Sequence, residues 1–482
     1  MEPISTGVPG LDRVLKGGLR PRGLHVVGGM PGTGKTTLAQ QISYHHAQAG
    51  GRVLYLVALS ETAERLVGHA SGFSFFDPAM VAHRIYYISV YSKLEEGGLD
   101  AVLDEVRTLV REHKASMVCV DGLSTLKAVA PTPLDFRRFI FDLNAQLRSL
   151  GVTTLILGPW AEWEADNPEF AVAEGILTMS LEPGADASER YLEVLKLRGS
   201  DHLEGRHSFA ITQTGVVVFP RLEAVLADEG VRQPPREWRR LSTGSEGLDQ
   251  MLRGGIPTGS VTLLAGGPGA GKTTLGLSYL AEGGRNGEHG IYFGFEEAPS
   301  RLLGKAEGLG LSIAEMVDGG SQQLHWLPAL ELNPDQVAWR LLELVDSTQA
   351  QRLVIDGMDA VLSRLASTRR SQPYLAGLMA ALRSRNVTTI MTYELPRVGG
   401  PGLDQIYERV SAVTDNIMML QYVELRSELH RLISILKVRE SDFDPSIREF
   451  TISTGGLHVT DTFGSAEAVL TGIGHWRGRR AQ

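Results

Sequence analysis

The stretch Gly29-Met30-Pro31-Gly32-Thr33-Gly34-Lys35-Thr36-Thr37 recurs further along the chain as Gly266-Gly267-Pro268-Gly269-Ala270-Gly271-Lys272-Thr273-Thr274. Both copies fit the pattern G-x-x-x-x-G-K-T, and each lies between an apolar run and a segment of helical character. Glycines in such a loop let several backbone N–H groups turn toward phosphate oxygens, and the positive end of the following helix strengthens the attraction. The sequence therefore predicts two ATP sites, with Lys35 and Lys272 reaching the β- and γ-phosphates.

The segments before the two loops repeat as well. Ser5-Thr6-Gly7 and Gly10-Leu11-Asp12 return as Ser242-Thr243-Gly244 and Gly247-Leu248-Asp249, at the same offset of 237 residues as the loops. Features that keep their order at one offset indicate a tandem duplication. Between the copies, Pro234-Pro235 blocks both helix and central strand and so suits a linker. We predict one domain in residues 1–229 and a second in residues 236–482.

Short apolar runs alternate with amphipathic segments in each copy. The runs cover residues 24–27, 53–56, 117–120 and 154–157 in the first copy, and residues 261–264, 291–295, 353–355 and 388–391 in the second. Such runs indicate parallel strands that are buried on both faces. Later runs at residues 191–195 and 432–436 are expected to form an antiparallel edge. The predicted fold class is α/β: two tandem domains, each a mostly parallel sheet with helices on both faces.

Composition and charge exclude several classes of protein. The chain has 482 residues, of which 43% are hydrophobic and 21% charged, so it is long enough and apolar enough for two folded cores. Its net charge of −9 argues against a nucleic-acid partner, and its one cysteine, Cys119, excludes a disulfide framework. Because the sequence has neither a signal-peptide pattern nor a membrane-spanning run, we expect a cytoplasmic protein with no membrane partner.

Each copy also carries candidate ligands for a magnesium ion. The last residue of each phosphate loop's core pattern is a threonine, Thr36 or Thr273, whose hydroxyl can ligate Mg²⁺. Asp121 and Asp356 end apolar runs that are predicted to be strands of the same sheets. An acid at that position is placed to hold a water molecule of the Mg²⁺ shell. The expected cofactors are therefore ATP and Mg²⁺.

A pair of acids distinguishes the second copy from the first. Glu296-Glu297 follows the apolar run at residues 291–295, which places a carboxylate near the expected γ-phosphate. Such a carboxylate can orient and deprotonate a water molecule or a hydroxyl for in-line attack. The equivalent stretch of the first copy is Leu59-Ser60-Glu61, in which Glu61 is the remaining candidate and Ser60 cannot act as a base unaided. We therefore expect the two sites to differ in activity.

With these motifs, the sequence resembles the KaiC family of RecA-type ATPases over nearly its whole length. The most specific stretches are Lys196-Leu197-Arg198-Gly199-Ser200-Asp201-His202 and Leu420-Gln421-Tyr422-Val423-Glu424-Leu425-Arg426. The second runs on into Lys437-Val438-Arg439. The resemblance implies RecA-like P-loop domains in a double-ring homohexamer, with nucleotide bound between subunits. It also implies that Lys196 and Arg198, and likewise Lys437 and Arg439, reach the γ-phosphate of the next subunit. Alternate residues of a strand point the same way, so each pair can converge on one anion.

The family's second domain is similar to an autokinase that phosphorylates an adjacent serine and threonine. The matching stretch here is Val410-Ser411-Ala412-Val413-Thr414-Asp415, so Ser411 is the only acceptor at those two positions. Alanine has no hydroxyl, and the two-site phosphorylation cycle of the circadian clock protein cannot run in that form. We expect ATP hydrolysis, with serine autophosphorylation as a hypothesis, and a first domain that binds ATP tightly but hydrolyses it slowly.

On this interpretation, we expect a signalling switch in which nucleotide or phosphorylation state changes which regulatory protein binds. Two alternatives stay open at the level of sequence. A DNA-dependent motor of the RecA or RadA type would be stimulated by single-stranded DNA in a salt-sensitive way. A nucleotide-sensing scaffold would combine very slow turnover with tight, ATP-dependent assembly.

Overall fold

The computed structural model describes residues 2–58, 62–159, 167–183, 188–230, 239–328, 333–365, 370–395, 410–425, 427–439 and 441–462. The chain divides into two units, Met1–Asp228 and Glu229–Gln482, and the predicted linker falls largely outside the described residues. Within the described ranges, no helix combines the length and the apolar character that crossing a membrane requires.

The first unit contains nine strands and the helices between them. Its strands are β1 Leu24–Gly28, β2 Val53–Val57, β3 Ile85–Ser89, β4 Met117–Asp121, β5 Thr153–Gly158, β6 Gly175–Pro183, β7 Ser188–Leu197, β8 Arg206–Thr212 and β9 Gly215–Phe219. Its helices are α1 Leu11–Val14, α2 Lys35–Gln48, α3 Ala63–Ala70, the 3-10 turn η1 Pro78–Met80, α4 Tyr91–His113, α5 Leu123–Val129, α6 Pro133–Ser149, α7 Pro168–Val172 and α8 Leu222–Glu229.

The second unit repeats this plan after a short two-stranded ribbon. Its strands are β10 Arg240–Leu241, β11 Ile256–Pro257, β12 Val261–Gly266, β13 Gly290–Gly294, β14 Gln322–Trp326, β15 Arg352–Asp356, β16 Thr388–Glu394, β17 Asn416–Leu425, β18 Glu428–Val438, β19 Arg448–Ser453 and β20 Gly456–Thr462. Its helices are α9 Glu246–Met251, α10 Lys272–Arg285, α11 Pro299–Gly308, α12 Ile313–Asp318, α13 Pro334–Thr348, α14 Met358–Arg364 and α15 Ser371–Ser384.

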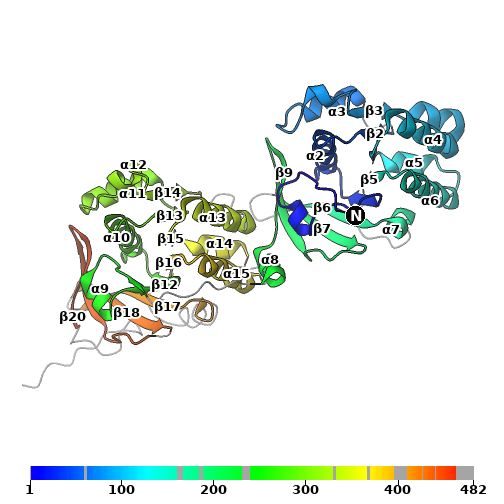
Figure 1. Cartoon of the computed structure of the whole chain (residues 1–482). Helices are drawn as coiled ribbons and strands as arrows, with labels where there is room; N and C mark the ends of the chain where they lie inside the picture. The colour runs from blue at the N-terminus through cyan, green and yellow to red at the C-terminus, as the bar shows by residue number, and fades with distance from the viewer. Residues whose placement is uncertain are drawn as a thin grey trace, which may run out of the picture. The chain divides into compact units, whose positions relative to one another are not determined.

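Both large sheets have nine strands in the same order. The order is β3-β2-β4-β5-β1-β6-β7-β8-β9 in the first unit and β14-β13-β15-β16-β12-β17-β18-β19-β20 in the second. The first six strands of each sheet are parallel, and the last three continue it in antiparallel fashion. Figure 1 shows helices on both faces of the parallel part in each unit. The predicted α/β class, with tandem RecA-like domains, is confirmed.

The strand predictions differ from the structure in two respects. All eight apolar runs named as parallel strands are parallel strands. The parallel edge strands β3 and β14 were not predicted, and neither were β6 and β17, which pair in parallel with β1 and β12. The edge strands β3 and β14 have a half-buried pattern, which makes their apolar runs less continuous than those of the central strands. The runs at residues 191–195 and 432–436 are antiparallel, as predicted, within β7 and β18. They are not the edge of the sheet, since β8–β9 and β19–β20 extend it further.

The repeated Ser-Thr-Gly motif is a local hydrogen-bonded unit in both copies. Asp249 accepts hydrogen bonds from the hydroxyls of Ser242 and Thr243 at 2.6 and 2.7 Å. Asp12 does the same for Ser5 and Thr6. The aspartate therefore fixes the segment that leads into the first strand of each sheet, which explains why these residues recur together.

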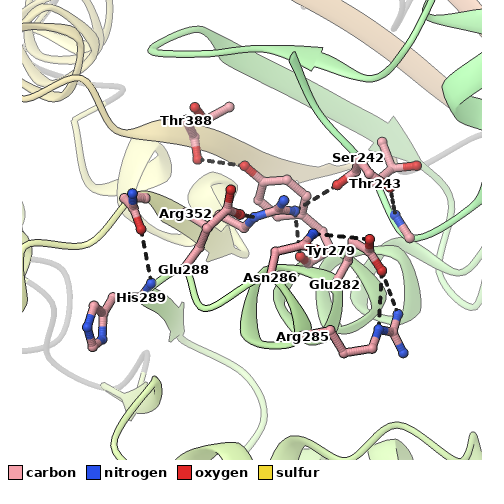
Figure 2. Close-up of polar contacts among 12 residues, drawn as sticks. Ser242, Thr243, Tyr279, Glu282, Arg285, Asn286, Glu288, His289, Arg352 and Thr388 are labelled. Atoms are coloured by element: carbon pink, nitrogen blue, oxygen red, sulfur yellow. Dashed lines mark hydrogen bonds and ion pairs between the residues drawn. The ribbon is translucent and has the colours of Figure 1, made fainter. Parts of the chain in front are cut away.

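A buried ion pair joins this lead-in segment to the core of the second unit (Figure 2). Arg352, the first residue of β15, is 1% exposed and pairs with Glu288. Its guanidinium also donates to the carbonyl oxygens of Ser242 and Tyr279, and it lies 4.4 Å from the centre of the Tyr279 ring. The first unit has no such pair at this place, because β4 begins with Met117 instead. One buried guanidinium thus holds the lead-in segment, α10 and β15 together.

We expect Glu288→Gln to destabilise the second unit by about 3–5 kcal/mol, because it leaves the Arg352 charge buried without its partner. The matched control is Glu282→Gln, which removes a more exposed ion pair with Arg285 and should cost less than about 1 kcal/mol. Hydrogen exchange of peptides across β15, followed in increasing denaturant, measures both effects. Equal effects of the two substitutions would show that the buried pair has no special weight.

Candidate functional sites

Both predicted phosphate loops connect a central strand to a helix. The first runs from β1 into α2, and the second from β12 into α10. Gly34 and Gly271 precede the helices with φ of 105° and 106°, a left-handed conformation that favours glycine. No described side chain caps either helix, so the first N–H groups are left to an anion. This uncapped, positively polarised end fits the phosphates of a nucleotide.

The lysine of each loop lies across the mouth of its own loop. The ammonium of Lys35 donates to the carbonyl oxygens of Gly29 and Met30 at 2.7 and 2.9 Å, and burial lowers its pKa. Lys272 makes the same two loop contacts, both at 3.0 Å, and adds an ion pair with Glu394 at 3.3 Å. Each ammonium is therefore positioned over the place that the loop prepares for phosphate.

The threonine and the strand-end aspartate of each copy meet as the sequence predicts. Thr36 donates to Asp121 at 3.0 Å, and Thr273 donates to Asp356 at 2.9 Å. In the described parts of the chain, no group of three or more His, Cys, Asp or Glu side chains could hold a metal by itself. A threonine hydroxyl, a carboxylate and phosphate oxygens together suit Mg²⁺, which is usually bound through few protein ligands and substrate phosphates.

Glu296 lies where the sequence predicts, in the cavity beside the second loop. This cavity has a volume of about 320 Å³ and is also lined by Lys272 and Asp356. Burial raises the pKa of Glu296, and the negative charges of Asp359, Glu394 and Asp356 raise it further, while Lys272 lowers it. Among the described residues, no group forms a hydrogen bond or an ion pair with the Glu296 carboxylate. It is thus available to a ligand and holds a proton more readily than an ordinary glutamate.

Glu297, the other member of the pair, is engaged differently. It forms an ion pair with Lys305 of α11. It still lines the same cavity, but its carboxylate is neutralised by this lysine. The two adjacent acids therefore differ in the structure: Glu297 has an ion-pair partner, and Glu296 is available to a ligand.

Two further acids of the second site were not among the predicted site residues. Asp359 lies in the first turn of α14, three residues after Asp356, and accepts a hydrogen bond from the backbone of Glu394. Burial raises the pKa of Asp359. Glu394 ends β16, next to the loop strand β12. Their positions after two adjacent strand ends could have indicated the site, since such ends share one edge of a parallel sheet.

The first site lacks these acids at the equivalent places. Ser124 stands three residues after Asp121, and Pro159, which follows the end of β5, takes the place that Glu394 has at the end of β16. Its cavity is larger, about 450 Å³, and Asp121 is the one carboxylate among the described residues that line it. The Ser60-Glu61 stretch, which carries the predicted acid of this site, lies outside the described residues. The two sites share their phosphate loops and differ in charge.

The two Lys-x-Arg pairs lie at the far end of the sheets from the loops of their own domains. Lys437 donates to the carbonyl oxygens of Ser411 and Thr414, which come just before β17. The phosphate loop comes just after β12, which is parallel to β17. These ends are separated by the length of a six-residue strand, about 20 Å, which a lysine side chain cannot span. Arg439 lies at the same end, 3.5 Å from Asp415.

The first unit repeats this arrangement. Lys196 donates to the carbonyl oxygen of Phe170 and Arg198 to that of Ala171, just before β6. Since β6 is parallel to β1, this end is again opposite to the loop of the same domain. The structure therefore does not bring the predicted basic residues together with the loop, the threonine and the aspartate of their own domain.

Together, these features define a tandem P-loop ATPase with RecA-like domains. A family model described as "ATPase: KaiC" matches residues 4–223 and again residues 241–463. The chain is 29% identical to the circadian clock oscillator protein KaiC of Picosynechococcus sp., over 98% of this chain and 92% of that protein. It is 26% identical to the circadian clock protein KaiC3 of Synechocystis sp., over 98% of this chain and 94% of that one. The chain belongs to the KaiC family of ATPases.

Proposed function

We propose that this protein is an Mg-ATP-dependent ring ATPase in which the second domain carries most of the hydrolysis. The observation that carries the proposal is the exposed and available carboxylate of Glu296 in the same cavity as Lys272 and Asp356. Glu296 orients and deprotonates the attacking water molecule. Lys272 and the N-terminus of α10 bind the phosphates, and Thr273 and Asp356 hold the metal. Mg²⁺, when bound, neutralises charge that develops on the phosphate oxygens.

The first domain has a different part in this proposal. Its loop residues, with Thr36 and Asp121, bind ATP and Mg²⁺ in the same way, and Glu61 is its remaining candidate acid. Because Pro159 and Ser124 take the places of Glu394 and Asp359, it lacks the acidic surroundings that raise the pKa of Glu296. We infer slow hydrolysis there and a main role in assembly.

The positions of the basic pairs support a shared site between subunits. Lys437 and Arg439 cannot reach the nucleotide of their own domain, so in the proposed ring their action on phosphate comes from the neighbouring subunit. The same holds for Lys196 and Arg198 in the first domain. A ring, with a homohexamer as its expected form, brings the basic end of one subunit against the loop of the next. Nucleotide state can then change the ring's conformation and so its affinity for a regulatory protein.

If Glu296 is the base, turnover falls as the pH drops through its raised pKa, because the protonated carboxyl cannot accept a proton. Glu394→Gln removes one of the negative charges that raise this pKa and should move the acid limb of kcat/KM to lower pH. Rates from about pH 5 to about pH 8, measured with the first site silenced by Lys35→Ala, test this. Glu282→Gln is the control. An acid limb that stays in place or moves upward contradicts the assignment.

Mixing two inactive variants tests the shared site. Glu296→Gln alone should lose about a hundredfold or more in turnover, and Arg439→Ala should also be strongly impaired. In an equal mixture, roughly a quarter of the interfaces combine an intact Glu296 with an intact Arg439, so part of the activity should return. Mixing Arg439→Ala with the double variant is the control, since no intact interface can form. No recovery in the first mixture argues against a trans role.

Autophosphorylation of Ser411 is a second proposed activity. Ser411 lies at the basic end of the sheet, where Lys437 binds its carbonyl oxygen, so its phosphate would come from the ATP of a neighbouring subunit. We expect intact-mass analysis after incubation with Mg-ATP to show one phosphoryl adduct that Ser411→Ala lacks. A wild-type protein that consumes ATP and stays unmodified would remove the kinase activity from the proposal and leave the ATPase.

A further inference from the structure

A tyrosine on the strand next to the metal carboxylate contacts it in each site. In the second site, the hydroxyl of Tyr292 donates to Oδ2 of Asp356. Tyr292 is the central residue of β13, is 1% exposed, and lies beside Val354 in the neighbouring strand β15, whose last residue is Asp356. In the first site, Tyr55 of β2 makes the same contact with Asp121, at 3.2 Å.

Hydroxyl donors surround the Asp356 carboxylate. Thr273 shares Oδ2 with Tyr292, and Thr392 donates to the other oxygen, Oδ1. Thr392 in turn accepts a hydrogen bond from the backbone N–H of Gly357. In its contact with Asp356, the hydroxyl of Tyr292 is the donor. With both oxygens engaged, the carboxylate has one fixed orientation.

The backbone makes room for the tyrosine ring in the second site. A Cβ atom at Gly294, two residues further along β13, would lie 2.8 Å from a ring carbon of Tyr292. Side chains two apart on a strand point to the same face, so any larger residue at Gly294 would press on the ring. The first unit has Val57 at this position, and Tyr55 still contacts Asp121 there. In the second site as it stands, a Cβ at Gly294 would have to shift the ring of Tyr292.

We propose that Tyr292 is a positioning residue for the metal carboxylate of the second site, and that Tyr55 has this role in the first. The proposal rests on the proposed role of Asp356 in holding Mg²⁺. A carboxylate that is already oriented loses no rotational freedom when the metal binds, whereas a free one must be ordered first. Neither tyrosine reaches the nucleotide phosphates through this contact; each acts through its aspartate.

The test is Tyr292→Phe in the full-length chain, with the first site silenced by Lys35→Ala. Binding of a fluorescent ATP analogue is followed in EDTA and then during a Mg²⁺ titration. We expect the half-saturating Mg²⁺ concentration to rise roughly three- to tenfold, since a hydrogen bond to a charged group is lost. Affinity in EDTA should stay the same, because the loop contacts are untouched. Gly294→Ala, which displaces the ring but keeps its hydroxyl, should change the Mg²⁺ response in the same direction.

Tyr279→Phe is the matched control. Its hydroxyl also makes a buried hydrogen bond, to the carbonyl oxygen of Thr388 at 3.1 Å, but at the opposite end of β16 from the site (Figure 2). It should leave the Mg²⁺ titration unchanged. An unchanged titration in Tyr292→Phe, or an equal loss of affinity with and without Mg²⁺, overturns the positioning role. If the Lys35→Ala parent itself shows no response to Mg²⁺, the proposed metal role of Asp356 fails, and the inference falls with it.

Discussion

The hydrogen bond between the threonine of each phosphate loop and the strand-end aspartate depends on one constraint, the parallel alignment of the central strands. Because those strands end at the same edge, Thr273 and Asp356 meet although 83 residues separate them in sequence. Thr36 and Asp121 meet for the same reason across 85 residues. The cavities lie at these edges, so the parallel alignment of the backbone strands determines where both sites are.

The duplicated fold has diverged mainly in charge. Around Lys272, Glu296 lies near Asp359 and Glu394, whose negative charges raise the pKa of the Glu296 carboxylate. Around Lys35, the positions equivalent to Asp359 and Glu394 hold Ser124 and Pro159. Two sites with equal loops can therefore bind similar phosphates while differing in their capacity for proton transfer. A division of labour between hydrolysis and assembly follows from this difference, within the proposed function.

The same strand alignment also sets a requirement on assembly. Lys437 and Arg439 lie at the end of the sheet opposite to the loop, held by carbonyl oxygens and by Asp415. On the proposed function, each domain therefore carries both halves of a shared site, at opposite ends of its sheet. In the proposed ring these halves meet between neighbours, which makes ATP hydrolysis sensitive to how subunits contact one another. That sensitivity is the physical basis of the proposed switch.

The sequence by itself determined the duplication, the α/β class, both loops and their Thr–Asp partners, because these depend on local patterns and a constant offset. It also singled out Glu296. Only the tertiary structure decided that Glu297 is neutralised by Lys305, that Asp359 and Glu394 lie near Glu296, and that Tyr292 contacts Asp356. These contacts join residues from different strands, and their geometry depends on sheet order and register. The spacing of residues along the chain does not determine sheet order or register, so these contacts could not be predicted before the fold was known.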